Sequence, residues 1–159
     1  MSTSTTVPVA PYTVTKLSIE DGMDIAMWRA PGPWAVQDSL ESPKPDEGYW
    51  AVRDAENRLI GYCCFGETAL PLGLDRVPGT LDVALGISPQ FSGRHLSRDF
   101  AQAVVDHAAS VAQGRRLRCS VPEWNAVGRH TAESVGFKLI GIHEVRGGRT
   151  VTPFYVYEI

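Results

Sequence analysis

The sequence has few of the features that mark secreted or membrane-spanning proteins. Three of its 159 residues are cysteine, an odd number, and no apolar run approaches the roughly 20 residues that span a bilayer. Residues 1–11 are rich in Ser, Thr and Pro and lack the basic and apolar regions of a secretory signal. We therefore expect a cytoplasmic protein with reduced thiols, no membrane association and a disordered tail over residues 1–11.

Positive charge is also scarce. Lys and Arg number 15 against 18 Asp and Glu, which gives a net charge of −3. Because non-specific binding to nucleic acid depends on a basic surface, we expect no nucleic-acid partner. The histidines have no cysteine or carboxylate at the spacing of zinc ligands, so we also expect no metal.

The residues that are present are typical of one globular domain. The chain is 43% hydrophobic, 9% aromatic and 21% charged, close to the average for folded proteins. Its length suits a single buried core. We place this domain at residues 12–159.

Hydrophobic periodicity predicts a mixed α/β domain. The polar turn formers at 54–58 separate two β-rich runs and predict a hairpin. Apolar residues at helical spacing predict a helix of about four turns before Gly114. We expect strands at 12–17, 49–53, 59–66, 80–87, 116–121, 137–145 and 151–159. We expect helices from Ser18 to before Pro31, within 34–40, from Leu96 to before Gly114, and after an N-cap at Asn125 as far as Val135.

The segment from Leu85 to Ser97 carries the strongest functional signal. A buried strand there turns through a short glycine-containing loop directly into the longest predicted helix. The unpaired N–H groups and the positive dipole at such a helix start form an anion site, and a backbone cradle suits a pyrophosphate. A single glycine before a helix is more often only a turn.

The wider pattern resembles a known family. Gln90-x-x-Gly93 after a strand, an amphipathic helix, a further strand, Asn125 and Gly136-Phe137 together resemble the GNAT superfamily of acyl-CoA-dependent N-acyltransferases, over Tyr12 to Ile159. The resemblance implies an α/β (α+β) single domain with a mixed central sheet of six to seven strands, splayed fourth and fifth strands and about four helices. It also implies transfer of an acetyl group from acetyl-CoA to a primary amine by direct attack in a ternary complex.

The resemblance assigns the cosubstrate to particular residues. It places the pantetheine arm against the end of the fourth strand, the pyrophosphate in the following loop, and a further CoA contact after the fifth strand. The implied acetyl-CoA-binding residues are Leu85, Gly86, Ile87, Gln90, Phe91, Ser92, Gly93, Arg94, His95, Leu96, Ser97 and Asn125.

Three positions depart from the family pattern. His95 and Ser97 stand where small residues are usual, and Ala132 stands where many relatives have a tyrosine that protonates the leaving thiolate. These departures leave an alternative open, namely a catalytically degenerate GNAT-fold module that binds CoA or a partner without turnover.

The candidate general bases are Asp82, on the strand face shared with Ala84 and Gly86, and Glu67, at the end of the third strand. The alternatives are a strand-end carboxylate satisfied by backbone or arginine for Asp82, a solvated loop carboxylate for Glu67, and direct deprotonation by solvent.

The candidate acceptor wall consists of Trp28, Trp34 and Trp50, because these aromatic residues occur in the two regions that line the acceptor pocket in relatives. Core packing is the alternative role for them. We expect a small-molecule or peptide amine as acceptor. The final strands or an exposed sheet edge offer a route to a homodimer.

Overall fold

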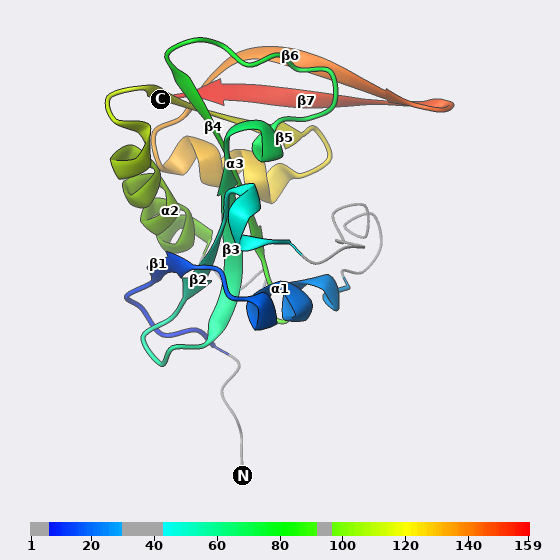
Figure 1. The fold of residues 1–159 in the computed structure, drawn as a ribbon. Coiled ribbons are helices and arrows are strands. Elements are labelled where there is room, and N and C mark those ends of the chain that lie inside the picture. Colours follow the sequence, from blue (N-terminus) through cyan, green and yellow to red (C-terminus); the bar gives the residue numbers. More distant parts are fainter. Residues whose placement is uncertain (1–6, 30–42, 92–96) are drawn as a thin grey trace.

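A computed structural model describes residues 7–29, 43–91 and 97–159 as a seven-stranded sheet with helices on both faces (Figure 1). The strands are β1 (Thr13–Lys16), β2 (Tyr49–Arg53), β3 (Leu59–Phe65), β4 (Thr80–Ile87), β5 (Arg116–Pro122), β6 (Lys138–Gly147) and β7 (Thr150–Glu158). The α-helices are α1 (Ile19–Ala26), α2 (Ser97–Ala112) and α3 (Ala126–Ser134), and two short 3₁₀ helices are η2 (Pro45–Glu47) and η3 (Gly66–Ala69). Over these ranges, none of the helices is both long and apolar enough to cross a membrane.

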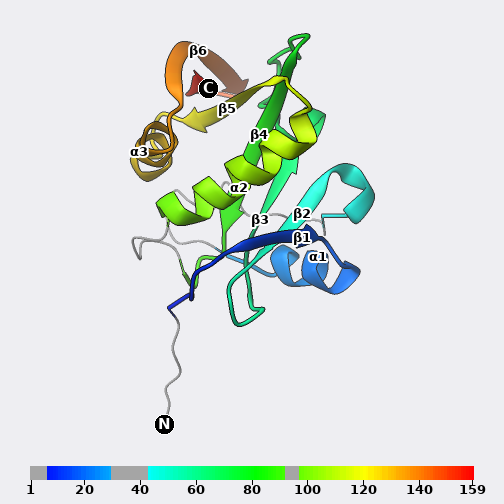
Figure 2. The same ribbon diagram turned by 90° about the vertical axis from the view of Figure 1, so that its left-hand side faces the viewer.

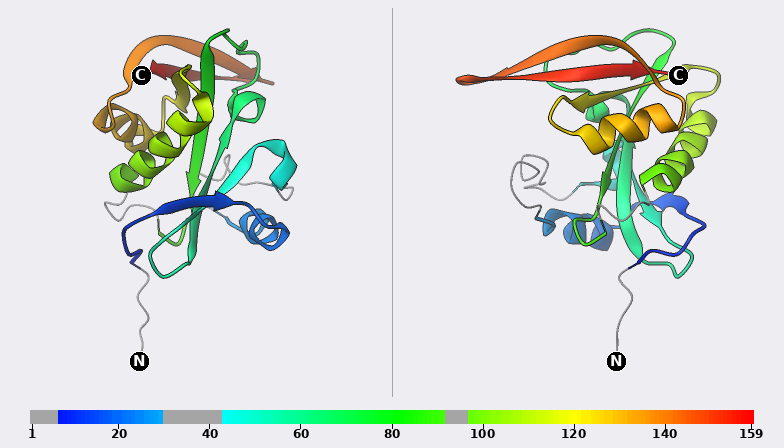
Figure 3. Two further views of the ribbon diagram at one scale, coloured as in Figure 1. Left: turned by 60° about the vertical axis from the view of Figure 1, so that its left-hand side comes forward. Right: turned by 180° about the vertical axis from the view of Figure 1, so that it is seen from behind.

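The sheet has the strand order β1-β2-β3-β4-β5-β7-β6. Strands β1 to β4 form an antiparallel meander in chain order, and β4 pairs with β5 in parallel through the α2 crossover. Strand β7 pairs antiparallel with both β5 and β6. Helices α2 and α3 lie on one face and α1 on the other (Figures 2 and 3).

Helix starts follow the capping residues in the sequence. The Ser18 hydroxyl accepts a hydrogen bond from the Asp21 N–H, and the Asp21 carboxylate accepts one from the Ser18 N–H, so both groups of a capping box are satisfied. The Asn125 side chain accepts a hydrogen bond from the Gly128 N–H at 2.8 Å and begins α3.

The main core lies between the sheet and α2. Phe100, Val104 and Ala108 of α2 are fully buried against residues of β2 to β5. Gly61 of β3 allows this close approach, because a Cβ there would overlap the Phe100 ring. A smaller cluster of Leu17, Ile25 and Ala51 packs under α1 on the opposite face.

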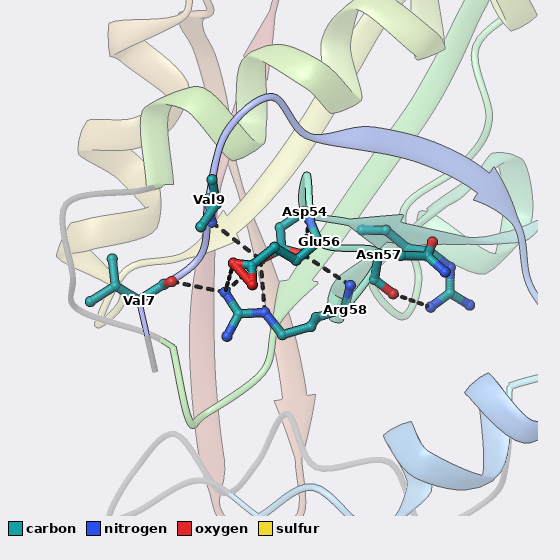
Figure 4. Close-up of polar contacts among 7 residues, drawn as sticks. Val7, Val9, Asp54, Glu56, Asn57 and Arg58 are labelled. Carbon is teal, nitrogen blue, oxygen red and sulfur yellow. Dashed lines mark hydrogen bonds and ion pairs between the residues drawn. The ribbon is translucent and has the colours of Figure 1, made fainter. Parts of the chain in front are cut away.

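The N-terminal segment is attached to the turn between β2 and β3 (Figure 4). The Val9 N–H donates to the Asp54 carboxylate, and the Arg58 guanidinium donates to both that carboxylate and the Val7 carbonyl. The Ala55 N–H donates to the Val9 carbonyl at 2.7 Å. Hydrogen bonding therefore starts upstream of residue 12, within the segment that the sequence predicted as a tail.

The predicted fold class is confirmed, and most predicted elements lie within a few residues of the observed ones. Helix α1 ends at Ala26, earlier than the proline-based prediction, because the chain turns at Met27, whose N–H donates to the Asp24 carbonyl. The fourth predicted helix, within 34–40, lies outside the described residues.

Candidate functional site

The central strands β4 and β5 separate part-way along their length. They pair only at Thr80–Asp82 with Arg116–Arg118. Beyond that point, among the described strands, Val83–Ile87 pairs with β3 alone and residues 119–122 pair with β7 alone. We call these two segments, which face each other without pairing, the β4–β5 splay.

The paired end of the two strands carries a buried ion pair. Asp82 is 3% exposed and Arg118 is 5% exposed. The guanidinium donates to both carboxylate oxygens, at 2.7 and 3.2 Å, and to the Asp75 carbonyl at 2.8 Å. This geometry corresponds to the arginine-satisfied carboxylate that was the alternative to a base at Asp82.

The β4 side of the splay is accessible although β4 lies in the middle of the sheet. Leu85 is 40% exposed, whereas Leu81 and Val83, before and at the separation, are buried. Gly86 lies across from Tyr62 in the register with β3, and a Cβ at this glycine would overlap the Tyr62 ring. The predicted pantetheine contacts Leu85, Gly86 and Ile87 thus all lie in the splay.

Only part of the predicted pyrophosphate loop is described. Gln90 is exposed and Phe91 is buried, with its N–H donating to the Ser88 carbonyl. The Arg58 guanidinium lies over the Phe91 ring, 5.9 Å from its centroid. Residues Ser92, Gly93, Arg94, His95 and Leu96 lie outside the described residues, and Ser97 is the first residue of α2.

Two residues to which the family resemblance assigns roles, Asn125 and Ala132, lie at the start of α3 and within it. Asn125 follows the splayed end of β5 and is the N-cap of α3, so its side-chain oxygen is held by a backbone N–H. Ala132 is buried in the main core and carries no hydroxyl. The tyrosine that the family resemblance implies here, as the acid that protonates the leaving thiolate, is therefore missing from this position.

Glu67 lies in η3, which follows β3 and contacts β4, and Gly66 of η3 lines a hollow together with Thr80 and Leu81 at the start of β4. Its carboxylate accepts a hydrogen bond from Arg76 at 3.0 Å, and both side chains are largely exposed. This hollow of about 500 Å³ is also lined by Arg76, Arg115 and Asp82 among others. Glu67 and the hollow thus lie toward the paired end of β4 and β5.

The predicted aromatic wall is divided between the two faces of the sheet. Trp28 and Tyr49 both approach Tyr62, with ring centroids 6.2 and 5.9 Å away, beside the smaller cluster under α1. Trp50 instead packs edge-on against His107 of α2 at 4.5 Å. The structure therefore does not bring Trp28 and Trp50 together, and Trp34 lies outside the described residues.

Burial favours the neutral forms of one tyrosine, three cysteines and one histidine in and beside this part of the sheet. Burial raises the pKa of Tyr62 and of the thiols of Cys63, Cys64 and Cys119 to about 12, so these groups stay protonated at neutral pH. Burial also lowers the pKa of His107. Across the described ranges, no group of three or more His, Cys, Asp or Glu is placed to hold a metal ion.

Ser120 was not among the site residues predicted from the sequence. Its hydroxyl oxygen is buried, and no hydrogen-bond partner for it is found among the described residues. Alternation along β5 was the available signal, since Leu117, Cys119 and Val121 pack toward the main core and Ser120 must point to the face that carries Arg118.

Comparison with known families identifies the class. A family model described as acetyltransferase (GNAT) domain matches residues 18–138. The chain belongs to this GNAT acetyltransferase family, and the resemblance given by the sequence is confirmed.

Solved structures agree on the fold. A GNAT-family acetyltransferase from Bacillus anthracis superposes with a TM-score of 0.69 at 15% identity, over 95% of each chain. The yncA protein of Salmonella typhimurium, solved with its cofactor acetyl-CoA, gives 0.61 at 15% identity, over 93% of this chain and 92% of that one. A dodecameric spermidine N-acetyltransferase from Vibrio cholerae gives 0.66 at 18% identity, over 93% and 92%. No curated protein matches the chain.

Proposed function

We propose that this protein is an N-acetyltransferase that moves the acetyl group of acetyl-CoA to a primary amine by direct attack in a ternary complex. The observation that carries the proposal is the β4–β5 splay. A central strand that loses its partner after Asp82, and leaves Leu85 40% exposed, provides an accessible strand edge in the middle of the sheet.

The residues of the splay fit the pantetheine arm of acetyl-CoA. On its β5 side, the backbone of Val83–Ile87 has no strand partner within the described part of the chain. Such an edge recognises an extended chain that carries amide groups much as it would recognise another strand. Gly86 adds no side chain of its own to this edge.

The chain's own contribution is mainly positioning and polarisation. Acetyl-CoA supplies the activated acyl group. A β4 backbone N–H directed at the thioester oxygen would stabilise the negative charge that develops there, and holding the amine beside the thioester removes the entropy cost of their encounter. Of the two predicted bases, Asp82 is held by Arg118 in a buried ion pair, whereas Glu67 pairs with Arg76 on the exposed surface and stays accessible. The amine proton is therefore proposed to leave to water or to Glu67.

The acceptor is proposed to be a small-molecule or peptide amine. Trp28, Tyr49 and Tyr62 form an aromatic cluster on the sheet face that also carries Gly86. Aromatic faces suit an apolar or cationic amine body. Spermidine, named as the substrate of the Vibrio cholerae protein, belongs in the first amine panel.

The test combines calorimetry of acetyl-CoA binding with thiol release over the amine panel. Leu85→Glu places a charge in the splay and should weaken acetyl-CoA binding at least tenfold, about 1.4 kcal/mol. Ile142→Glu is the matched control, because Ile142 is an exposed strand residue on β6. A folded wild type that binds no acetyl-CoA would refute the proposal. Binding without turnover of any amine would favour the degenerate module.

A further inference from the structure

We propose that Ser120 is an acetyl-CoA-binding residue whose hydroxyl forms a hydrogen bond with the pantetheine arm inside the β4–β5 splay. This inference rests on the proposed function and adds a side-chain contact to a site otherwise built from backbone.

The position of Ser120 follows from strand register. Asp82 pairs with Arg118 in the parallel β4–β5 ladder, and their side chains form an ion pair on one face of the sheet. Residues two apart in a strand share a face. Ser120 therefore points to the same face as Ala84 and Gly86, two residues beyond the last β4–β5 pair, and would stand beside Ala84 if the ladder continued.

The state of the hydroxyl indicates a missing partner. The Ser120 oxygen is buried, yet no hydrogen-bond partner for it occurs in the described part of the chain. Buried hydroxyls are nearly always hydrogen-bonded, and an unsatisfied one lowers stability. A group that is costly to the protein alone is explained when a ligand supplies the partner.

The chemistry of a serine matches the arm that the splay would hold. A hydroxyl both donates and accepts, so it can bond an amide N–H, an amide carbonyl or a thioester oxygen. The neighbouring β5 side chains Cys119 and Val121 face the main core and offer no such group to the splay. Ser120 is thus the side chain on this part of β5 that can make the contact.

The test is calorimetry of acetyl-CoA binding, together with the melting temperature of the ligand-free protein, on wild type and Ser120→Ala. The variant should raise the Kd about tenfold, because a hydrogen bond inside the complex is lost. The melting temperature should be unchanged or higher, because the substitution removes an unsatisfied group from the free protein.

Thr15→Val is the matched control. The Thr15 hydroxyl is also buried without a partner among the described residues, but it lies on β1 at the far edge of the sheet. Its replacement should leave the Kd for acetyl-CoA unchanged.

Each other outcome overturns the inference. Wild-type affinity in Ser120→Ala would leave the proposed function intact and reject the role of Ser120. A lowered melting temperature would show that the hydroxyl has a partner within the protein. Absence of acetyl-CoA binding in the wild type would reject both the inference and the proposed function.

Discussion

The two ends of the β4–β5 pair are built in opposite ways. At one end the strands are hydrogen-bonded, and the buried side chains of Asp82 and Arg118 join them through two charged hydrogen bonds. At the other end the same strands do not pair, and Leu85 is exposed. Strong cross-strand bonding thus ends where the accessible edge begins.

The open end has its own buried carboxylate, placed away from the splay. Asp54, in the β2–β3 turn, accepts hydrogen bonds from the N–H groups of Val9, Glu56 and Arg58 and from the Arg58 guanidinium (Figure 4). Arg58 in turn lies over Phe91 in the loop before α2. The two ion pairs thus lie on either side of the unpaired β4 segment. Asp82 and Arg118 lie where β4 and β5 still pair, and Asp54 and Arg58 lie in the turn beyond the other end of β4.

The largest effect is expected from breaking the paired end. Asp82→Ala should lower the free energy of unfolding by about 3–5 kcal/mol, because it leaves the Arg118 guanidinium buried without its counter-charge. Urea denaturation measures this loss. The double variant Asp82→Leu with Arg118→Met should recover much of it.

The same variant distinguishes a structural role of the Asp82 carboxylate from a role as general base. A general base at Asp82 would instead give Asp82→Ala near-normal stability with strongly reduced turnover. A loss of stability below about 1 kcal/mol would contradict the structural role.

A smaller effect is expected at the open end from Asp54→Ala, about 2–4 kcal/mol, since several hydrogen bonds to a buried carboxylate are lost. Burial alone would raise the Asp54 pKa, but hydrogen bonds from Arg58 and Val9 and the Arg58 charge lower it below the ordinary 3.8. The folded-state pKa is therefore below the unfolded one. The stabilisation is complete above pH 3.8 and is lost as the pH falls through the folded pKa.

Denaturant titrations at pH 7 and below pH 3.8 check this difference. Wild type should lose more stability on acidification than Asp54→Ala. Asp21, whose pKa is also lowered, keeps part of the acid sensitivity in the variant: burial raises that pKa, and hydrogen bonds from Ser18 and Arg53 outweigh it. Equal acid sensitivity of the two proteins would contradict the prediction.

The third prediction concerns the close contact between Gly86 and the Tyr62 ring beside the splay. Gly86→Ala should cost about 1–3 kcal/mol, because its Cβ overlaps the Tyr62 ring and must displace it. Combining it with Tyr62→Leu should give a smaller loss than the sum of the two single variants. Gly141→Ala is the control, because no atom of the described residues lies within 4 Å of that added Cβ and its effect should be close to zero. Thermal unfolding of the wild type and the four variants measures these effects.

The smallest effect is expected at Asn125. Asn125→Ala should cost about 1 kcal/mol through loss of the α3 N-cap, and Asn125→Asp should keep that stability because aspartate caps equally well. If the asparagine amide also contacts CoA, as the family resemblance implies, acetyl-CoA affinity should fall in both variants. Unchanged affinity in Asn125→Asp would restrict this residue to capping.

The elements that could be predicted from sequence depend on nearby residues. The bounds of β4 and the hairpin of β2 and β3 follow from apolar runs and turn formers, and the start of α3 follows from the capping choice at Asn125. Each signal lies within a few residues of the structure it controls, so no tertiary information was needed.

The partners of the site residues could not be predicted in this way. Arg118 meets Asp82 across 36 positions of sequence, and only strand pairing brings them together. The placement of Tyr49 and Trp50 on opposite faces of the sheet could have been predicted, because they are neighbours in one strand. That Trp28 lies on the same side as Tyr49 could not, since it depends on how α1 packs. The opening that exposes Leu85 depends on where a parallel ladder stops, which no local pattern encodes.

The short β4–β5 ladder has a consequence for how the molecule opens. Three residue pairs in the sheet connect an antiparallel meander, β1 to β4, to the unit formed by β5, β7 and β6. The core under α2 joins the two parts as well, because it contains residues of β2 to β5 and of β7. Opening should therefore start at the unpaired end of the ladder, where amides are expected to exchange sooner than those in the core. Any ligand that bridges Val83–Ile87 and Ser120 would slow that local exchange.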